Sequence, residues 1–252
     1  MKVQEAGLQG LKRIELDVYT DERGYFLESH QAERYAQALG CELRFVQDNC
    51  SHSRRGVLRG LHYQVGHPQG KLLRVVQGAI FDVAVDLRRN SATFGRWEAT
   101  VLAAPGFQVG ELPAVPDTAD ADAVDANAAD VDAASAGDAG TCKWGPAVGA
   151  GTDVGAGRGT DKHIQLWVPP GFAHGFYVLS DSATVEYKCT GYYRPDDEAC
   201  LRWDDPDVAI DWPGADPILS AKDRQGASLA DLLRAGRMPV ERAGWPARDL
   251  PA

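Results

Sequence analysis

The sequence predicts a mainly β protein built as an antiparallel sandwich or barrel. Extended runs recur along the chain, turn residues separate them, and few stretches have a helical composition. The clearest run is residues 81–88, in which Phe81, Val83, Val85 and Leu87 alternate with other residues and share one predicted face. A small barrel that is filled by side chains at one end and open at the other provides a pocket.

The elements before residue 106 begin with a predicted helix over residues 31–39. This stretch is rich in helix formers, and Gly40 stands where a glycine commonly ends a helix. Three strands are predicted in this half of the chain, at residues 71–77, 81–88 and 96–102. The first of them stops at Gly78.

Residues 107–161 differ in composition from the rest of the chain and are predicted to be a flexible insertion. They are mostly Ala, Asp and Gly, which provide too little apolar area to offset the entropy cost of ordering. Between Glu111 and Thr160, nine acids and two basic residues carry −7 of the chain's net charge of −10. The aspartates lack the Gly and terminal Glu that an EF-hand loop needs, so a solvated linker is favoured over a calcium site.

After the insertion the β pattern resumes, and the chain is expected to end in a short helix and a tail. Strands are predicted at residues 162–168, 172–179 and 183–190. Ser228 and Asp231 resemble a capping box before a group of leucines, which predicts a short helix that Gly236 ends. Residues 236–252 are expected to be a loose tail rich in proline and arginine. The prediction is therefore one domain over residues 1–106 and 162–235.

Composition limits the partners and the compartment. The net charge of −10 argues against general binding of nucleic acid or anionic membranes, because both need a basic surface. The five cysteines form no CxxC pair, which favours a reducing compartment over a disulfide framework. The N-terminus lacks the apolar core of a signal peptide, and no run of about 18 apolar residues is present to span a membrane. A cytoplasmic protein is expected.

Several titratable residues are candidates for chemistry, and each also has a structural interpretation. Arg59 and His62 face opposite ways in a regular strand, but Gly60 between them would permit a bulge that turns both into one pocket. The alternative is that Arg59 lies on the surface and that His62 is half-buried and hydrogen-bonded without a role in a pocket. His174 and Tyr187 also suit a core position in which each polar atom has a partner. For Lys71, Lys222 and Asp223, the alternative to a functional role is that each is an ordinary charged residue on the surface.

Taken together, these side chains suit proton transfer next to a carbonyl group. A histidine can act as a base near neutral pH, an aspartate can hold its tautomer, a lysine can stabilise an enolate oxygen, and a tyrosine can return a proton. Arginines suit a diphosphate. Catalytic metal chemistry is the competing use of the histidines, but the sequence has no H-x-H pair. Neither a bound metal nor a cofactor is expected.

Nine sequence blocks lie in order within residues 1–106 and 162–235: Asp21–Glu28, Gln47–Asn49, Gly56–His62, Lys71–Val75, Asp82–Arg88, Phe94–Trp97, Trp167–Phe176, Tyr187–Thr190 and Leu219–Asp223. Together they resemble the dTDP-4-dehydrorhamnose 3,5-epimerase family. Nine blocks in one order are far more specific than any single motif. The resemblance implies a cupin jelly roll (a double-stranded β-helix barrel) with a few short peripheral helices. It also implies a homodimer that works without a cofactor on a nucleotide sugar.

The resemblance further implies a role for each matching residue. His62 resembles the general base with Asp223 as its partner, Tyr187 resembles the proton donor on the opposite face, and Lys71 resembles the residue that stabilises the enolate at O4. Positions that contact the substrate are matched by Arg59, His174, Glu198 and Lys222. Positions that hold the nucleotide, some from the partner subunit, are matched by Arg23, Phe26, Glu28, Gln47 and Asn49. Tyr193 matches an aromatic residue that stacks near the nucleoside.

The implied reaction inverts C3 and C5 of dTDP-4-dehydro-6-deoxy-D-glucose to give dTDP-4-dehydro-L-rhamnose. A close alternative inverts only C3 or only C5 of a related nucleotide 4-keto-6-deoxy sugar, because the base and acid motifs are shared. A non-catalytic sugar-nucleotide-binding cupin is a second alternative, and loss of His62 or Tyr187 would have favoured it. A metal-dependent cupin oxygenase is a third, and the missing H-x-H pair argues against it.

Overall fold

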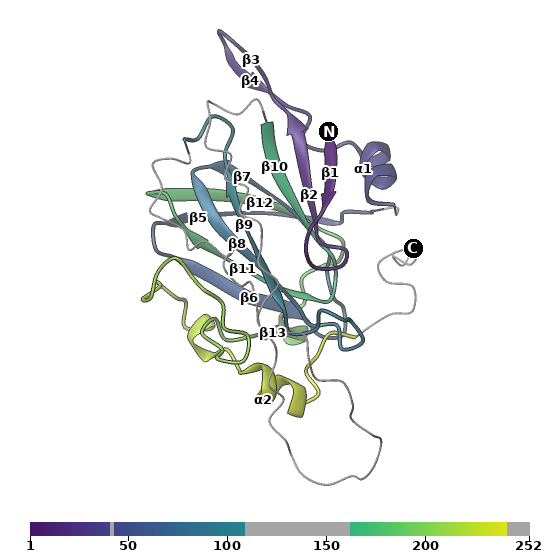
Figure 1. The fold of residues 1–252 in the computed structure, drawn as a ribbon, viewed down its shortest axis with the longest axis vertical. Helices are drawn as coiled ribbons and strands as arrows, with labels where there is room; N and C mark the ends of the chain where they lie inside the picture. The colour runs from purple at the N-terminus through teal and green to yellow at the C-terminus, as the bar shows by residue number, and fades with distance from the viewer. Residues whose placement is uncertain (41–42, 109–161, 241–252) are drawn as a thin grey trace, which may run out of the picture.

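Two antiparallel sheets packed face to face form the body of the molecule (Figure 1). The computed structural model describes residues 1–40, 43–108 and 162–240. The first sheet contains, in spatial order, β1 (Lys2–Glu5), β2 (Lys12–Asp17), β10 (Lys162–Val168), β7 (Lys71–Gln77), β12 (Ser182–Cys189) and β5 (Gln47–Arg54). The second sheet contains β13 (Glu198–Cys200), β6 (Leu58–Gln64), β11 (Phe172–Val178), β8 (Ala79–Asp86) and β9 (Trp97–Ala103).

The chain passes repeatedly from one sheet to the other. The successive strands β10, β11 and β12 lie in the first, second and first sheets, and neighbours within each sheet pair antiparallel. This alternation is typical of a jelly roll. The mainly β architecture predicted from the sequence is confirmed.

The second sheet is buried on both of its faces. Its inner face contributes Ile80, Ala84 and Phe176 to the core between the sheets. Its outer face is covered by the C-terminal segment, including helix α2 (Leu229–Arg234). Four alternating residues were predicted to share one face, and they do: Phe81, Val83 and Val85 of β8 and Leu87 just after it all lie in this outer cluster. The strand itself begins and ends two residues earlier than predicted.

Most other predicted elements lie where the sequence placed them. Helix α1 (Ala32–Leu39) is capped at its start by the Gln31 side chain and at its end by Gly40 in the left-handed conformation, with φ of 73°. Strand β7 stops at Gly78, whose φ is 74°. In α2 the Ser228 hydroxyl accepts a hydrogen bond from the backbone N–H of Asp231, so the predicted cap is present.

The predicted start of the C-terminal tail is wrong. Residues 237–240 pack on the barrel, where Met238 is buried in the outer cluster. The Tyr63 hydroxyl donates to the backbone oxygen of Arg237 at 2.8 Å, and the N–H of Val240 donates to the oxygen of Val65 at 2.7 Å. Backbone hydrogen bonds of this kind do not depend on side-chain composition, so a proline- and arginine-rich sequence did not reveal them. Residues 241–252 and 109–161 of the predicted tail and insertion lie outside the described residues.

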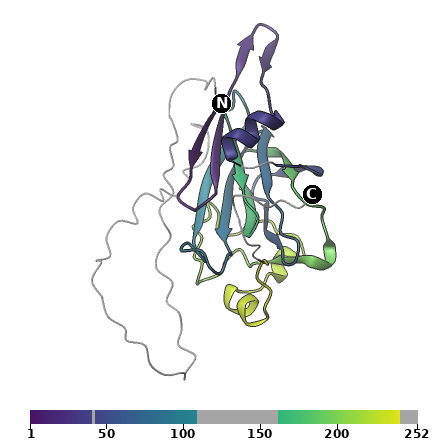
Figure 2. The same ribbon diagram turned by 90° about the vertical axis from the view of Figure 1, so that its right-hand side faces the viewer.

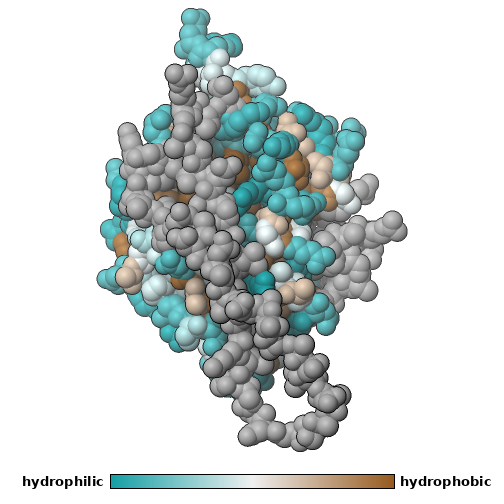
Figure 3. Space-filling model, viewed as in Figure 1, coloured by the Kyte–Doolittle hydropathy of each residue, from teal (hydrophilic) through white to brown (hydrophobic). Residues whose placement is uncertain are grey.

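A two-stranded hairpin extends from one end of the barrel, opposite the end that carries α2 (Figures 1 and 2). It is formed by β3 (Tyr19–Asp21) and β4 (Gly24–Phe26). On the face that Figure 3 shows, the described residues are largely hydrophilic, with small separate hydrophobic areas. Within the described ranges, no helix is long and apolar enough to cross a membrane.

Candidate active site

A cavity of about 610 Å³ lies between the two sheets, within the usual range of about 300–1,000 Å³ for ligand sites. Strands of both sheets and the segments around residues 193–198 and 218–223 line it. Eleven of the fourteen residues singled out from the sequence meet there: Gln47, Asn49, Arg59, His62, Lys71, His174, Tyr187, Tyr193, Glu198, Lys222 and Asp223. Most of the residues predicted from the sequence therefore line one cavity.

The bulge predicted at Gly60 is present and turns both Arg59 and His62 into the cavity. Opposite β11, the pairing shifts register between His62 and Arg59. Gly60 has φ of 136°, and a Cβ at this position would lie 2.5 Å from the Cα of Gly175. Only glycine therefore fits where β6 and β11 approach this closely.

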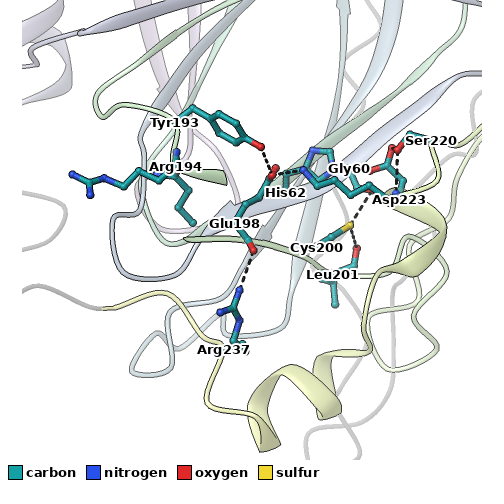
Figure 4. A network of polar contacts seen from close by, with 12 residues as sticks. Gly60, His62, Tyr193, Arg194, Glu198, Cys200, Leu201, Ser220, Asp223 and Arg237 are labelled. Atoms are coloured by element: carbon teal, nitrogen blue, oxygen red, sulfur yellow. Dashed lines mark hydrogen bonds and ion pairs between the residues drawn. The ribbon is translucent and has the colours of Figure 1, made fainter. Parts of the chain in front are cut away.

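His62 and Asp223 form a hydrogen-bonded pair at the cavity wall (Figure 4). His62 Nε2 lies 2.6 Å from Asp223 Oδ1, and the Ser220 hydroxyl donates to Asp223 Oδ2 at 2.8 Å. Burial alone would raise the pKa of Asp223, but the hydrogen bonds from His62 and Ser220 outweigh it and hold that pKa below its ordinary value. The carboxylate therefore stays ionised at neutral pH and fixes the orientation of the imidazole ring.

Tyr187 reaches the same cavity from the other sheet. It lies on β12 of the first sheet, whereas His62 lies on β6 of the second. Burial, with a further contribution from Cys189, raises the pKa of the Tyr187 hydroxyl above its usual value, so the phenol is protonated at neutral pH. The His62 imidazole and the Tyr187 phenol thus line the cavity from opposite sheets.

Lys71 provides a cation in the cavity. It begins β7, where it pairs with Cys189 of β12 and Val168 of β10. Burial lowers the pKa of its ammonium group, and Cys189, Glu198 and Asp82 partly oppose that shift. An ammonium group in this position can stabilise negative charge that develops on a nearby oxygen.

A second polar group lies beside the His62–Asp223 pair (Figure 4). The Tyr193 hydroxyl donates to Glu198 Oε2 at 2.7 Å, and the Lys222 ammonium forms an ion pair with the same oxygen. Burial alone would raise the pKa of Glu198, but the hydrogen bonds from Lys222 and Tyr193 lower it. These three side chains hold one another in place at the cavity wall.

Two further contacts in the cavity were not anticipated. His174 Nε2 lies 2.9 Å from Oδ2 of Asp82, which is fully buried, and the Arg59 Nε–H donates to the Ser53 hydroxyl at 2.8 Å. Asp82 carried a signal that the sequence analysis did not use: an acid inside an apolar strand needs a buried partner. Nothing in the sequence around Ser220, three residues before Asp223, indicated its hydrogen bond to that carboxylate.

Three of the predicted residues are not brought into the cavity. Arg23 and Phe26 lie on the β3–β4 hairpin, where Arg23 pairs with Asp21 and 69% of Phe26 is exposed. Glu28 follows the hairpin and forms an ion pair of 2.6 Å with Arg34.

One group in the described part of the chain has donor atoms close enough to share a metal ion. A ring nitrogen of His62, Cys200 Sγ and a carboxylate oxygen of Asp223 all lie within 4.8 Å of one another. Two of these residues form the hydrogen-bonded pair described above. Burial raises the pKa of the Cys200 thiol to about 12, so the uncomplexed thiol is protonated.

Known proteins similar to this chain are nucleotide-sugar epimerases. A family model described as dTDP-4-dehydrorhamnose 3,5-epimerase matches residues 5–109 and 153–231. The dTDP-4-dehydrorhamnose 3,5-epimerase of Pseudomonas aeruginosa is 38% identical over 92% of this chain and 97% of its own length. The dTDP-4-dehydrorhamnose 3-epimerase of Streptomyces niveus is 32% identical over 95% of this chain and 89% of its own length.

A solved structure gives the same result. The dTDP-6-deoxy-D-glucose-3,5-epimerase of Legionella pneumophila, in complex with dTDP-4-keto-L-rhamnose, superposes with a TM-score of 0.70 at 39% identity. The match covers 96% of this chain and 99% of that one. The similarity therefore extends over whole chains and includes the fold.

Proposed function

The chain belongs to the dTDP-4-dehydrorhamnose 3,5-epimerase family, and we propose that it inverts C3 and C5 of dTDP-4-dehydro-6-deoxy-D-glucose to give dTDP-4-dehydro-L-rhamnose. The observation that carries this proposal is the placement of the His62–Asp223 pair and the Tyr187 phenol on opposite walls of one cavity. Inversion of a carbon next to a ketone needs a base on one face of the sugar and an acid on the other.

His62 acts as the base. It removes the proton from C3 or C5, which the C4 ketone makes acidic, and the electron pair moves to the ketone oxygen as an enolate. The Lys71 ammonium stabilises that oxygen where negative charge develops. Asp223 holds the ring in place and stabilises the imidazolium that forms.

Tyr187 acts as the acid. When the enolate collapses to the ketone, the phenol gives its proton to the opposite face of the same carbon and the configuration inverts. After this step His62 carries one extra proton and Tyr187 lacks one. Exchange with solvent restores both groups, so no net proton is consumed and no redox partner is needed.

The remaining cavity residues are proposed to bind the substrate. Arg59 offers a planar cation to the diphosphate, and Gln47, Asn49 and Tyr193 are proposed to contact the nucleoside. Contacts to the sugar and the diphosphate are proposed for His174, Glu198 and Lys222.

A homodimer is proposed to complete the nucleotide site. The β3–β4 hairpin exposes Tyr19, Tyr25 and Phe26, and exposed aromatic side chains in one group are characteristic of interfaces. In this arrangement Arg23, Phe26 and Glu28 reach the cavity of the partner. A cytoplasmic location is proposed with it, because the cysteine content suits a reducing compartment.

Product stereochemistry tests the proposed function. The purified protein is incubated with dTDP-4-keto-6-deoxyglucose, and the configurations at C3 and C5 of the product are read by NMR coupling constants. Inversion at both carbons is expected. A product inverted only at C3 would instead support a 3-epimerase, the candidate favoured by the similarity to the Streptomyces niveus enzyme. Unchanged substrate would support a binding protein without catalysis.

Epimerisation is expected to survive removal of metal ions. The proposed base, acid and enolate-stabilising group are all protein side chains, namely His62, Tyr187 and Lys71. The protein is treated with a strong chelator, desalted and assayed beside an untreated sample. Equal rates are expected. A loss of activity that one added metal restores would contradict the proposal.

The single catalytic domain is proposed to fold and work without the insertion. Strand β9 ends at Ala103, the next backbone N–H bonds to the oxygen of Gly78 at 2.9 Å, and β10 begins at Lys162, so both anchors belong to the barrel. The family match also omits residues 110–152. Loop closure costs only ~0.6 kcal/mol per doubling of length. Replacing residues 108–160 with a short Gly/Ser linker is therefore expected to leave Tm and kcat nearly unchanged.

The linker variant is compared with the full chain by thermal unfolding and by the NMR assay. An insoluble variant would mean that the segment packs on the barrel. A soluble but inactive variant would mean that it contributes to the site.

A further inference from the structure

A thiol lies beside the proposed base and has no part in the proposed reaction. Cys200 of β13 is the register partner of His62 on β6, so the two side chains stand on the same face of neighbouring antiparallel strands. Asp223 comes to the same point from the 3-10 turn Asp223–Gln225. Figure 4 shows Cys200 close to the His62–Asp223 pair. Three separate segments thus converge on one place.

The three side chains offer the ligand atoms that zinc prefers. Imidazole nitrogen, thiolate sulfur and carboxylate oxygen bind Zn²⁺ at about 2.0–2.3 Å in tetrahedral geometry, so two donors on one ion lie about 3.3–3.6 Å apart. In this structure the three donors all lie within 4.8 Å of one another. The most widely spaced pair therefore needs to close by up to about 1.5 Å for the three to share an ion.

We propose that His62, Cys200 and Asp223 form a zinc-binding site at which Zn²⁺ inhibits the enzyme. On binding, Zn²⁺ displaces the Cys200 thiol proton to solvent, and the proton on the His62 nitrogen that faces Asp223 moves to the other ring nitrogen. The ion then bonds to the thiolate, the freed imidazole nitrogen and the carboxylate. The hydrogen bond between His62 and Asp223 is replaced by bonds to the ion. The bound ion then occupies the base and its orienting carboxylate at once, so His62 cannot take a proton from the sugar.

The surroundings suit a soft divalent ion. A thiolate selects zinc over magnesium or calcium, which prefer all-oxygen sites. The Ser220 hydroxyl hydrogen-bonds to Asp223 Oδ2 and supports the carboxylate from behind, while the other carboxylate oxygen, Oδ1, faces His62. His62 is 27% exposed and lines the cavity, so the ion has a path of entry and a free fourth position for water.

The local charges also permit the ion. Lys222 and Arg224 flank Asp223 in the sequence; Arg224 is exposed, and the Lys222 ammonium group is already paired with Glu198. The carboxylates of Asp223 and Glu198 therefore outnumber this ammonium group. Burial keeps the uncomplexed Cys200 thiol protonated, and a bound metal ion replaces that proton.

Zinc titration of three proteins tests the site. Wild type, Cys200→Ser and Cys50→Ser are freed of metal and assayed for epimerisation with increasing Zn²⁺. Cys50 is an exposed cysteine on β5 and serves as the matched control. All three are expected to be active without metal. Wild type and Cys50→Ser should be inhibited alike, and the half-inhibiting zinc concentration of Cys200→Ser should be at least about tenfold higher, since even outer-shell partners change metal affinity by 10–100-fold.

Co²⁺ provides a readout that does not depend on activity. A tetrahedral cobalt complex with a thiolate ligand has a sulfur-to-metal charge-transfer band in the near ultraviolet, which wild type and Cys50→Ser should show and Cys200→Ser should lack. The zinc-inhibition assay depends on the proposed role of His62 in catalysis, whereas the cobalt absorption measurement does not. A protein without epimerase activity would therefore overturn the proposed function while the cobalt band still tests the site.

Either of two results would overturn the zinc site. The first is equal inhibition of wild type and Cys200→Ser, or no inhibition of either. The second is a wild-type cobalt complex without the thiolate band, or with a band that Cys200→Ser retains.

Discussion

Replacing His62 by alanine is expected to abolish both deuterium uptake and inversion of the sugar. Without the imidazole no group remains in the proposed position to remove the C3 and C5 protons, and Asp223 keeps only its bond from Ser220. A positioned base contributes about 10²–10⁴-fold, so both rates should fall at least that far. Time-resolved NMR in D₂O follows label and stereochemistry separately in one sample.

His67→Ala is the matched control for this variant. His67 lies three residues beyond β6, is half exposed and pairs with Asp197 at 3.1 Å. It is not among the residues that line the cavity. Both rates of this variant should stay close to wild type. Exchange at the wild-type rate in His62→Ala would assign the base to another residue even though the family remains the same.

Replacing Tyr187 by phenylalanine is expected to separate exchange from inversion. The variant keeps the ring, which packs against the core between the sheets, and loses only the hydroxyl that returns the proton. His62 can still remove a proton and return solvent deuterium to the same face. Inversion should therefore fall by about 10²–10⁴-fold, while deuterium continues to enter at C3 or C5. The same NMR experiment measures both.

Tyr192→Phe controls for the loss of a phenol. Tyr192 is mostly exposed and lies outside the cavity lining, so its variant should invert the sugar normally. Normal inversion by Tyr187→Phe would show that another acid faces His62. Loss of exchange together with inversion would show that the hydroxyl is needed for proton removal as well.

The sequence predicted the fold well where local chemistry decides structure. Gly40 and Gly78 end α1 and β7 at the predicted residues, because each takes a left-handed conformation that favours glycine. Gly60 indicated the bulge that turns Arg59 and His62 the same way. These signals are contained in a few neighbouring residues.

Contacts between residues far apart in the sequence could not be predicted from such local signals. His174 and Asp82 are 92 positions apart, and His62 and Asp223 are 161 apart. Spacing alone pairs none of them; the second pair was predicted only through the family resemblance, and the first was missed. The packing of residues 237–240 was likewise hidden, because it depends on backbone bonds to the barrel.

The three residues outside the cavity show a different limit. The sequence match groups Arg23, Phe26 and Glu28 with the binding residues, but the first two lie on a hairpin that extends away from their own barrel (Figure 2). A sequence match carries a role without saying which chain supplies it. Their contribution depends on the proposed dimer.

The most direct test of the central claim is the deuterium content of the product made by the wild-type protein in D₂O. If His62 and Tyr187 exchange protons at both carbons next to the ketone, NMR should show deuterium at C3 and at C5 together with inversion at each. Inverted product that retains the original hydrogen at either carbon would contradict proton transfer through two solvent-exchanging groups. Deuterium at neither carbon and no inversion would contradict catalysis altogether.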